Sequence, residues 1–158
     1  MKDFLCGFTP HDRKSPVTDA WQPLWSRWGD DAVEIGFDVA VCHCNARGLL
    51  HGGMLATLAD NAMGLSLGLA LKGLTQLTAL PAKGAISGIV TTSLNLDYVG
   101  MVRVGQRVVI SPRVVYIGKG SGVVDALVFG DGITVARANG AFRVLRDGLK
   151  SGAQTHDT

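Results

Sequence analysis

Residues 45–60 read Asn-Ala-Arg-Gly-Leu-Leu-His-Gly-Gly-Met-Leu-Ala-Thr-Leu-Ala-Asp, and this stretch decides the fold that we expect. Its two adjacent glycines open an apolar run that ends at Lys72-Gly73, which predicts a helix over residues 52–71. The first N–H groups of a helix lack intrahelical partners, and the helix dipole attracts negative charge there. The helix start can therefore hold a developing oxyanion, while Asp60 supplies a base or a nucleophile.

The spacing within this stretch predicts a homodimer. Gly52 and Asp60 are separated by eight positions, which is about 12 Å along a helix. One ester or thioester group is too small to touch both. If both act on one substrate, they come from two chains whose helices run antiparallel, with the sites at the dimer interface.

Composition indicates one compact globular domain in a chain of 158 residues. Hydrophobic residues make up 47% and charged residues 18%, and the net charge is +2, so we expect no nucleic-acid partner. The chain start lacks the apolar core of a signal peptide, and the three cysteines have no framework spacing. Asp60 and Asn61 interrupt the apolar run, which favours a buried helix over a membrane span. We expect a cytoplasmic protein that does not use a membrane.

The pattern along the chain predicts an α+β fold in one domain over residues 31–147. Residues 1–30 form an N-terminal segment, in which Trp21, Trp25 and Trp28 follow helical spacing and predict a short helix. Residues 148–158 are expected to be a flexible tail. Alternating runs predict one strand before the long helix and four after it, at residues 32–44, 89–98, 106–117, 122–129 and 133–145. An antiparallel sheet of five or six strands would wrap around one long central helix.

The predicted helix has one side of small residues. Its broad apolar side would face the sheet, whereas the opposite stripe holds Gly53, Thr57, Asp60, Gly64 and Gly68. A glycine inside a helix costs about 1 kcal/mol relative to alanine. Either another backbone or a ligand approaches this stripe closely, or the sheet packs tightly against it. The carboxylate on the stripe favours the first interpretation, because an unpaired buried Asp is costly.

The pattern N-x-x-G-x-x-H-G-G followed by L-A-D, over residues 45–60, resembles the PaaI-type hotdog-fold acyl-CoA thioesterases. The resemblance extends over about residues 32–145. It implies a hotdog fold, a homodimer that often pairs into a homotetramer, and an acyl-CoA as the small-molecule partner. It also implies that no metal or redox cofactor is needed, since coenzyme A is part of the substrate.

The resemblance assigns catalytic roles. Asp60 would activate water or attack the thioester carbon, and the Gly52 N–H would polarise the carbonyl. His51 and Asn45 would orient the turn and the reacting groups. The family often adds a hydroxyl from the strand after the helix, for which Thr91 matches best and Thr92 is the alternative. The connection at residues 72–88 is longer than is usual for the family and would reshape the pocket or form a lid.

Further residues are expected to bind substrate. We expect the acyl group to lie against the helix and the following strand, at Gly53, Met54, Met63 and Tyr98, and against part of the tryptophan segment. The glycine-rich turn after the third predicted strand offers Gly118, Lys119 and Ser121 to a coenzyme A phosphate, with a solvated hairpin as the equal alternative.

Cys42, His43 and Cys44 invite a zinc hypothesis. In a strand the two thiols point to one face and the imidazole to the other, so we expect no metal here but buried thiols.

Two other classes of function stay open. The same scaffold could be an enoyl-CoA hydratase or dehydratase, which needs a catalytic histidine, or a non-catalytic acyl-CoA-binding protein. The sequence does not distinguish aryl-acetyl from medium-chain or long fatty acyl groups.

Overall fold

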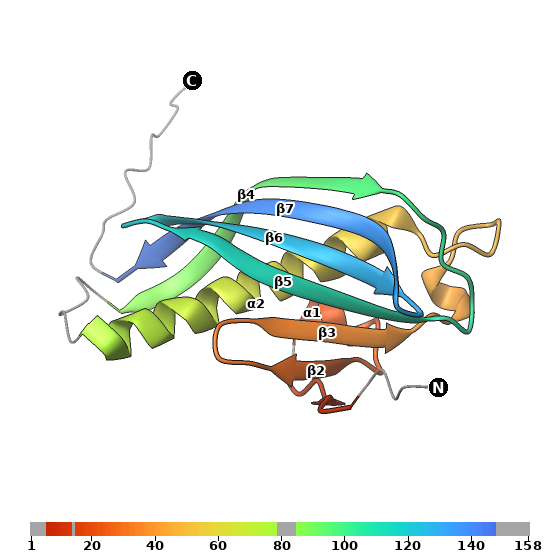
Figure 1. Ribbon diagram of the computed structural model, residues 1–158, viewed down its shortest axis with the longest axis horizontal. Coiled ribbons are helices and arrows are strands. Elements are labelled where there is room, and N and C mark those ends of the chain that lie inside the picture. Colours follow the sequence, from red (N-terminus) through yellow and green to blue (C-terminus); the bar gives the residue numbers. More distant parts are fainter. Residues whose placement is uncertain (1–5, 14, 79–84, 148–158) are drawn as a thin grey trace, which may run out of the picture.

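The computed structural model describes residues 6–13, 15–78 and 85–147, and of residues 75–78 the backbone alone (Figure 1). Its two α-helices are α1 (Pro16–Asp19) and α2 (Gly52–Thr78), and a single 3₁₀ turn, η1, spans Val41–His43. The strands are β1 (Thr9–Pro10), β2 (Trp25–Trp28), β3 (Val33–Asp38), β4 (Ile86–Tyr98), β5 (Arg107–Ile117), β6 (Ser121–Gly130) and β7 (Ile133–Arg146).

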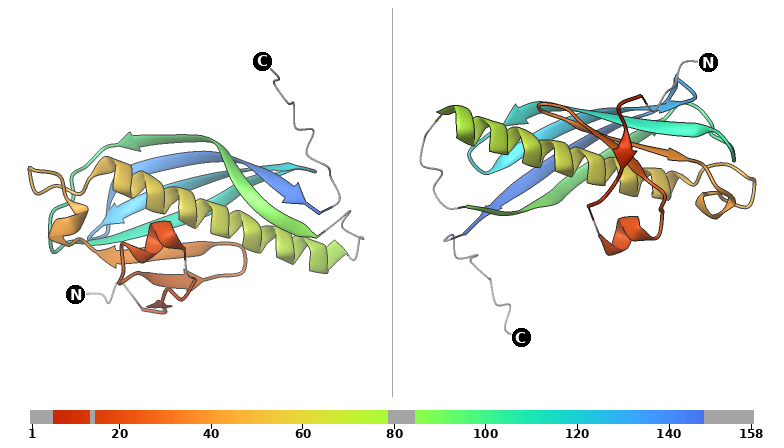
Figure 2. Two further views of the ribbon diagram at one scale, coloured as in Figure 1. Left: turned by 180° about the vertical axis from the view of Figure 1, so that it is seen from behind. Right: turned by 90° about the horizontal axis from the view of Figure 1, so that it is seen from below.

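All seven strands form one antiparallel sheet in the order β1-β2-β3-β5-β6-β7-β4. The sheet curls around α2, which lies along its concave face (Figures 1 and 2). The α+β prediction of one sheet around one long helix is confirmed. The sheet exceeds the predicted five or six strands because β1 and β2, from the N-terminal segment, extend it beyond β3.

The core lies between α2 and the inner face of the sheet. Alternate side chains of each strand point inward, as the period of two requires, and Val124, Ala126 and Val128 of β6 are at most 3% exposed. They meet the apolar side of α2, where Leu58 and Ala62 are fully buried. The window 52–74 is apolar enough for a membrane span, yet 56% of it is buried inside this sheet. It is thus a core helix, as its interruption by Asp60 indicates.

The prediction of a short helix through Trp21, Trp25 and Trp28 is wrong. The structure places a helix at Pro16–Asp19, before Trp21, and Trp25 and Trp28 belong to β2. Pro23 has no N–H to donate within such a helix. The backbone of residues 25–28 instead pairs with β3, where it finds a complete set of partners.

The strand predicted over residues 32–44 is too long. Val33, Ile35, Phe37 and Val39 are buried as expected, but β3 ends at Asp38 and Val41 is 76% exposed. The chain turns into η1, which turns His43 inward and leaves Cys42 exposed and Cys44 half-buried. The prediction of two buried thiols is therefore wrong.

The connection predicted over residues 72–88 is mostly regular structure. α2 continues to Thr78, and β4 begins at Ile86. The rest of this connection, residues 79–84, lies outside the described residues, as does the predicted tail at 148–158.

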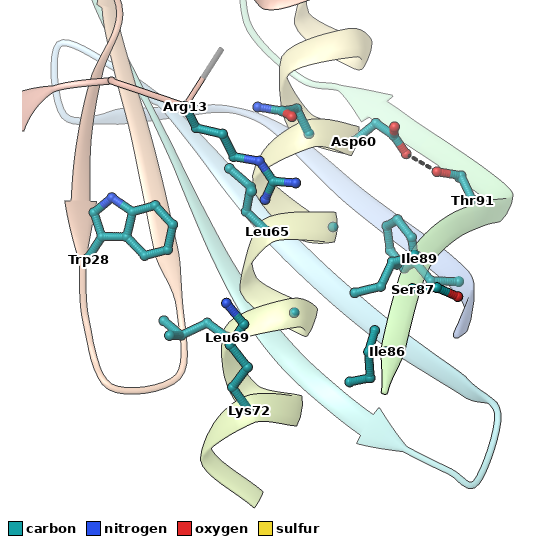
Figure 3. Close-up of a pocket in the computed structure, with 15 residues that line it drawn as sticks. Arg13, Trp28, Asp60, Leu65, Leu69, Lys72, Ile86, Ser87, Ile89 and Thr91 are labelled. Carbon is teal, nitrogen blue, oxygen red and sulfur yellow. Dashed lines mark hydrogen bonds between the residues drawn. The ribbon is translucent and has the colours of Figure 1, made fainter. Parts of the chain in front are cut away.

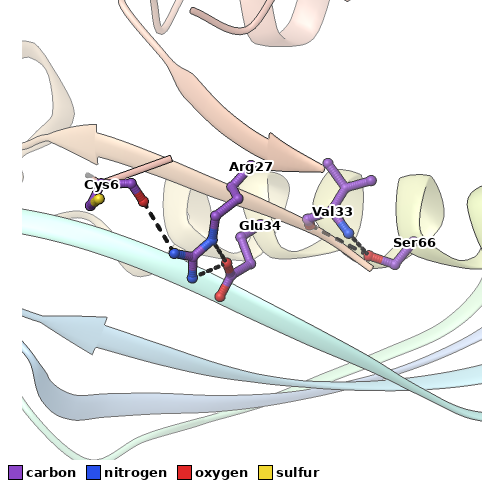
Figure 4. Close-up of polar contacts among 5 residues, drawn as sticks. All are labelled: Cys6, Arg27, Val33, Glu34 and Ser66. Atoms are coloured by element: carbon purple, nitrogen blue, oxygen red, sulfur yellow. Dashed lines mark hydrogen bonds and ion pairs between the residues drawn. The ribbon is translucent and has the colours of Figure 1, made fainter. Parts of the chain in front are cut away.

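Polar contacts tie β3 to α2 and to the neighbouring strand β2 (Figure 4). Ser66 of α2 accepts a hydrogen bond from the Val33 N–H at 2.9 Å and donates one to the Ala62 carbonyl at 2.8 Å. Arg27 of β2 forms an ion pair with Glu34 of β3 and donates to the Cys6 carbonyl. The strands β2 and β3 are thus held beside the middle of α2.

Candidate active site

The turn before α2 is held by two side chains of the 45–60 motif. The Asn45 Oδ1 accepts hydrogen bonds from the Arg47 N–H at 2.9 Å and the Leu49 N–H at 3.3 Å. The His51 Nδ1 accepts one from the Gly53 N–H at 3.0 Å. Both side chains therefore satisfy local backbone donors and fix the turn, and the Asn45 amide nitrogen still has its own hydrogens to offer.

The Gly52 N–H is a free donor at this helix start. No described residue accepts a hydrogen bond from it, while its neighbour at Gly53 is bound to His51. The Tyr98 hydroxyl donates to the Gly52 carbonyl at 2.7 Å, and burial raises the pKa of this phenol. A Cβ at Gly52 would lie 3.1 Å from the Tyr98 Cζ, so the close approach of Tyr98 explains why a residue without a side chain stands here.

Asp60 meets Thr91 across the gap between α2 and β4. The Thr91 hydroxyl donates to the Asp60 Oδ1 at 2.7 Å (Figure 3). Thr92, the alternative, donates instead to the Ala141 carbonyl at 3.0 Å, on the neighbouring strand β7. Consecutive side chains of a strand point to opposite faces, so the two threonines meet different partners. The geometry selects Thr91 of the two.

Two separate cavities contain the two halves of the motif. One, of about 400 Å³, is lined by Asp60, Thr91 and the apolar side chains between α2 and β4. The other, of about 190 Å³, is lined by Asn45, Gly52 and Tyr98. Asp60 also lines a third, shallow hollow with Thr57 and Leu94. One chain thus separates the carboxylate from the helix start, as the eight-residue spacing requires.

Some predicted substrate-binding residues are not at these cavities. Met54 and Met63 were expected to form pocket walls, but they are 4% and 0% exposed and belong to the core. The Met63 Cε packs toward Gly140 of β7, because Met63 lies on the side of α2 that faces the sheet and not on the side that carries the small residues. None of the three cavities lined by Asp60 or Gly52 is lined by a residue of the 118–121 turn.

The structure adds residues that the motif did not indicate. The larger cavity is also lined by Arg13 and Trp28 from the N-terminal segment, and by Asn61 and Lys72 of α2. Arg13 and Trp28 precede the motif by more than 15 positions, and only the pairing of β1 and β2 with the sheet brings them there. Trp28 belongs to the tryptophan segment, part of which was expected at the pocket, and Asn61 is adjacent to Asp60 in the sequence.

No three His, Cys, Asp or Glu side chains are close enough to hold a metal ion within the described part of the chain. This includes the 42–44 segment, where His43 turns inward and its Nδ1 accepts a hydrogen bond from the Ala40 N–H at 3.0 Å.

The family follows from a comparison with known proteins. Residues 47–136, which contain the helix and most of the sheet, match the family model described as the thioesterase superfamily. The chain belongs to the thioesterase superfamily. A Pseudomonas aeruginosa protein named "Putative esterase PA0474" is 30% identical over 141 residues, which cover 87% of this chain and 95% of the relative.

Solved structures of other proteins have the same thioesterase fold. A hypothetical thioesterase from Streptococcus pneumoniae TIGR4, crystallised with coenzyme A, superposes with a TM-score of 0.66 at 20% identity, over 80% of this chain and 91% of that one. A variant of the phenylacetic acid degradation protein PaaI from Thermus thermophilus gives 0.66 at 23% identity, over 83% and 100%. The expectation of a PaaI-like hotdog fold is confirmed.

Proposed function

We propose that this protein hydrolyses an acyl-CoA thioester to the free acid and coenzyme A. The observation that carries the proposal is the Asp60–Thr91 hydrogen bond at the wall of a cavity of about 400 Å³ that has both apolar and polar walls. The Streptococcus pneumoniae thioesterase of the same fold was crystallised with coenzyme A, which supports this class of substrate. Membership of the thioesterase superfamily supports the reaction type.

The proposed chemistry divides between Gly52 and Asp60. The thioester oxygen would accept a hydrogen bond from the free Gly52 N–H, which stabilises the negative charge that develops there. Asp60 would take a proton from water as the water oxygen attacks the carbonyl carbon, or attack that carbon itself. In the first case the C–S bond then breaks and the thiolate of coenzyme A receives that proton. In the second the thiolate leaves as a mixed anhydride forms on Asp60, and water hydrolyses the anhydride to the free acid, which restores the carboxylate and gives the remaining proton to the thiolate. Thr91 holds one carboxylate oxygen, Oδ1, and leaves Oδ2 for the reaction.

We infer that a second copy completes the site by pairing along β4. This 13-residue strand ends the described sheet, and a long unpaired edge is a template for another strand. Large apolar side chains are exposed along it and just after it, at Val90, Leu94, Tyr98, Val99 and Met101. A partner strand would cover them and bring the helix start of one chain to Asp60 of the other.

Two finer assignments stay proposals. We propose that two such dimers associate into a tetramer. Lys119 is exposed in the turn where the Gly118 N–H donates to the Ser121 carbonyl at 2.8 Å, and this turn would bind a phosphate of coenzyme A. Because the turn lines neither half of the site within one chain, another chain would have to bring it to the coenzyme.

The test is Asp60→Asn, which keeps the size of the side chain and removes its charge. We expect thiol release from acyl-CoA to fall about 10²-fold or more, as for the loss of a general base or nucleophile. Asp30→Asn, at an exposed loop position, is the matched control and should keep full turnover. Unchanged turnover in Asp60→Asn would refute the assigned role.

The other classes of function give different outcomes in the same assays. A hydratase would add water to crotonyl-CoA without releasing thiol, but His51, its candidate histidine, has its Nδ1 engaged by the Gly53 N–H. Tight acyl-CoA binding by the wild-type protein without thiol release would indicate a non-catalytic binding protein.

A further inference from the structure

The cavity beside Asp60 combines apolar walls with two cations. Leu65 and Leu69 of α2 and Ile86 and Ile89 of β4 make up much of its wall, and Arg13 and Lys72 line it as well. The Arg13 side chain reaches over α2 from the N-terminal segment, so that its guanidinium lies beside Leu65 (Figure 3). A purely hydrocarbon chain would form neither an ion pair nor a hydrogen bond with these two cations.

Both cations are without a counter-ion among the described residues. The described ion pairs belong to Arg27 with Glu34 and to Arg107 with Asp38. Asp60, the carboxylate of the same cavity, is bound to Thr91 and makes no ion pair with Arg13 or Lys72. Both side chains are exposed at this cavity, so a negatively charged ligand bound there could form charge-assisted hydrogen bonds with them.

The positions of these residues along α2 define a direction. Lys72 follows Asp60 by twelve residues, which is about 18 Å along the helix axis. Gly64 and Gly68 line the cavity between them, and a Cβ at Gly68 would already contact the Ile89 Cδ1 at 3.4 Å. An acyl chain whose carbonyl lies at Asp60 can therefore extend past Gly64 to the Arg13 guanidinium beside Leu65, and past Gly68 toward Lys72.

We propose that the acyl group carries a negative charge at its far end, and that Arg13 and Lys72 bind this distal carboxylate. The substrate class is then an α,ω-dicarboxylic acid with one end joined to coenzyme A. The inference rests on the proposed thioesterase function, because that function places the thioester at Asp60. A phosphate of coenzyme A is the other anion that could reach these cations, and the experiment separates the two.

The experiment compares octanoyl and suberyl thioesters, which differ only in the ω-carboxyl group, each joined either to coenzyme A or to N-acetylcysteamine, which has no phosphate. Affinities are measured with Asp60→Asn protein and kcat/KM with wild-type protein. We expect suberyl thioesters of both carriers to be preferred about tenfold, the size of one charge-assisted hydrogen bond. Arg13→Met and Lys72→Met should each reduce that preference, and Arg13→Lys should retain part of it.

The matched control is Arg113→Met, at an exposed position of β5 that does not line this cavity; its preference should equal that of wild type. Equal affinity for the two acyl groups would overturn the inference. The inference would also be overturned if Arg13→Met lost affinity for both coenzyme A thioesters but for neither N-acetylcysteamine thioester, because the cations would then bind phosphate. Hydrolysis of octanoyl-CoA without a suberyl preference would leave the thioesterase proposal standing. A suberyl preference in binding without any thiol release would instead overturn the thioesterase proposal and keep the anion site.

Discussion

Two buried imidazoles have charge states set by their surroundings. Burial lowers the pKa of His43, whose ring lies 5.6 Å from that of Phe37 and 5.7 Å from that of Trp21. Burial is also the main cause of the lowered pKa of His11. The negative charge of Asp12 opposes this shift, and the positive charge of Arg13 adds to it. The His43 Nδ1 accepts the Ala40 N–H, so the neutral ring is the form that fits the fold.

The lowered pKa values predict a loss of stability in acid. Both folded-state pKa values lie below the ordinary 6.5, so just below pH 6.5 the unfolded chain binds more protons than the folded protein. This contribution to the free energy of unfolding is complete above pH 6.5 and is lost as the pH falls from 6.5 through the folded-state values. Urea unfolding at pH 7.5 and 5.5 measures it. In His43→Asn, whose side-chain oxygen can replace Nδ1 as an acceptor but does not titrate, the difference between the two pH values should shrink; an equal difference would contradict the assignment.

For single residues, the sequence predicted spatial relations between residues that are close together in the chain. The distance from Gly52 to Asp60 follows from helix geometry alone, and the turn around Asn45 from its neighbours. The predicted hydroxyl could be narrowed only to two adjacent threonines, because the sequence does not show which face of the strand lies against α2 and Asp60. Arg13 could not be found at all, since its position depends on how the N-terminal segment crosses α2.

Among the elements, the contact between α2 and β3 bears most directly on the site. β3 is bordered by β2 on one side and β5 on the other, and Ser66 ties its first residue to the helix that carries Asp60. Ser66 is fully buried, so its hydroxyl has no alternative partner in water. Ser66 thus adds a directional polar contact to the apolar packing between β3 and α2.

Ser66→Ala should destabilise the protein by about 1–3 kcal/mol, because it leaves the buried Val33 N–H without an acceptor. The midpoint of urea unfolding would fall accordingly. Ser111→Ala on β5, half-buried and outside this contact, is the control and should change stability by about 0.5 kcal/mol or less. If the two variants unfold alike, the Val33 N–H has found another partner and the hydroxyl is dispensable.

Element types were predictable wherever the pattern was long and regular, as for β5, β6 and β7, whose bounds differ from the predicted ones by one residue at most. Predictions were wrong where a short pattern fits two structures. The spacing of Trp21, Trp25 and Trp28 fits a helix. However, the edge of β3 offers backbone donors and acceptors to residues 25–28, which pair with it as a strand. Similarly, the alternation that begins at Val33 does not reveal that β3 ends at Asp38, where the chain turns into η1.

At the scale of the whole molecule, the separation of the two half-sites is the main structural argument for an assembly. Within one chain the free Gly52 N–H and the Asp60 carboxylate line different cavities. The long β4 edge, with its exposed apolar side chains, lies at the opposite end of the sheet from the short β1 (Figure 1). A two-fold axis across β4 would place each helix start near the partner's carboxylate and create two equivalent sites.

Heterodimers test this arrangement. One chain carries Asp60→Asn; the other carries Gly52→Pro, which removes the free N–H while proline is well accepted at the first position of a helix. Its Cβ would lie 3.1 Å from the Tyr98 Cζ, so that ring must shift by a few tenths of an ångström. Each variant alone should be inactive. Co-refolding equal amounts should make half of the dimers mixed, each with one intact site, and restore about a quarter of wild-type thiol release. Mixed dimers that form but show no activity would mean that each site is built within a single chain, and a protein that remains monomeric would exclude a shared site altogether.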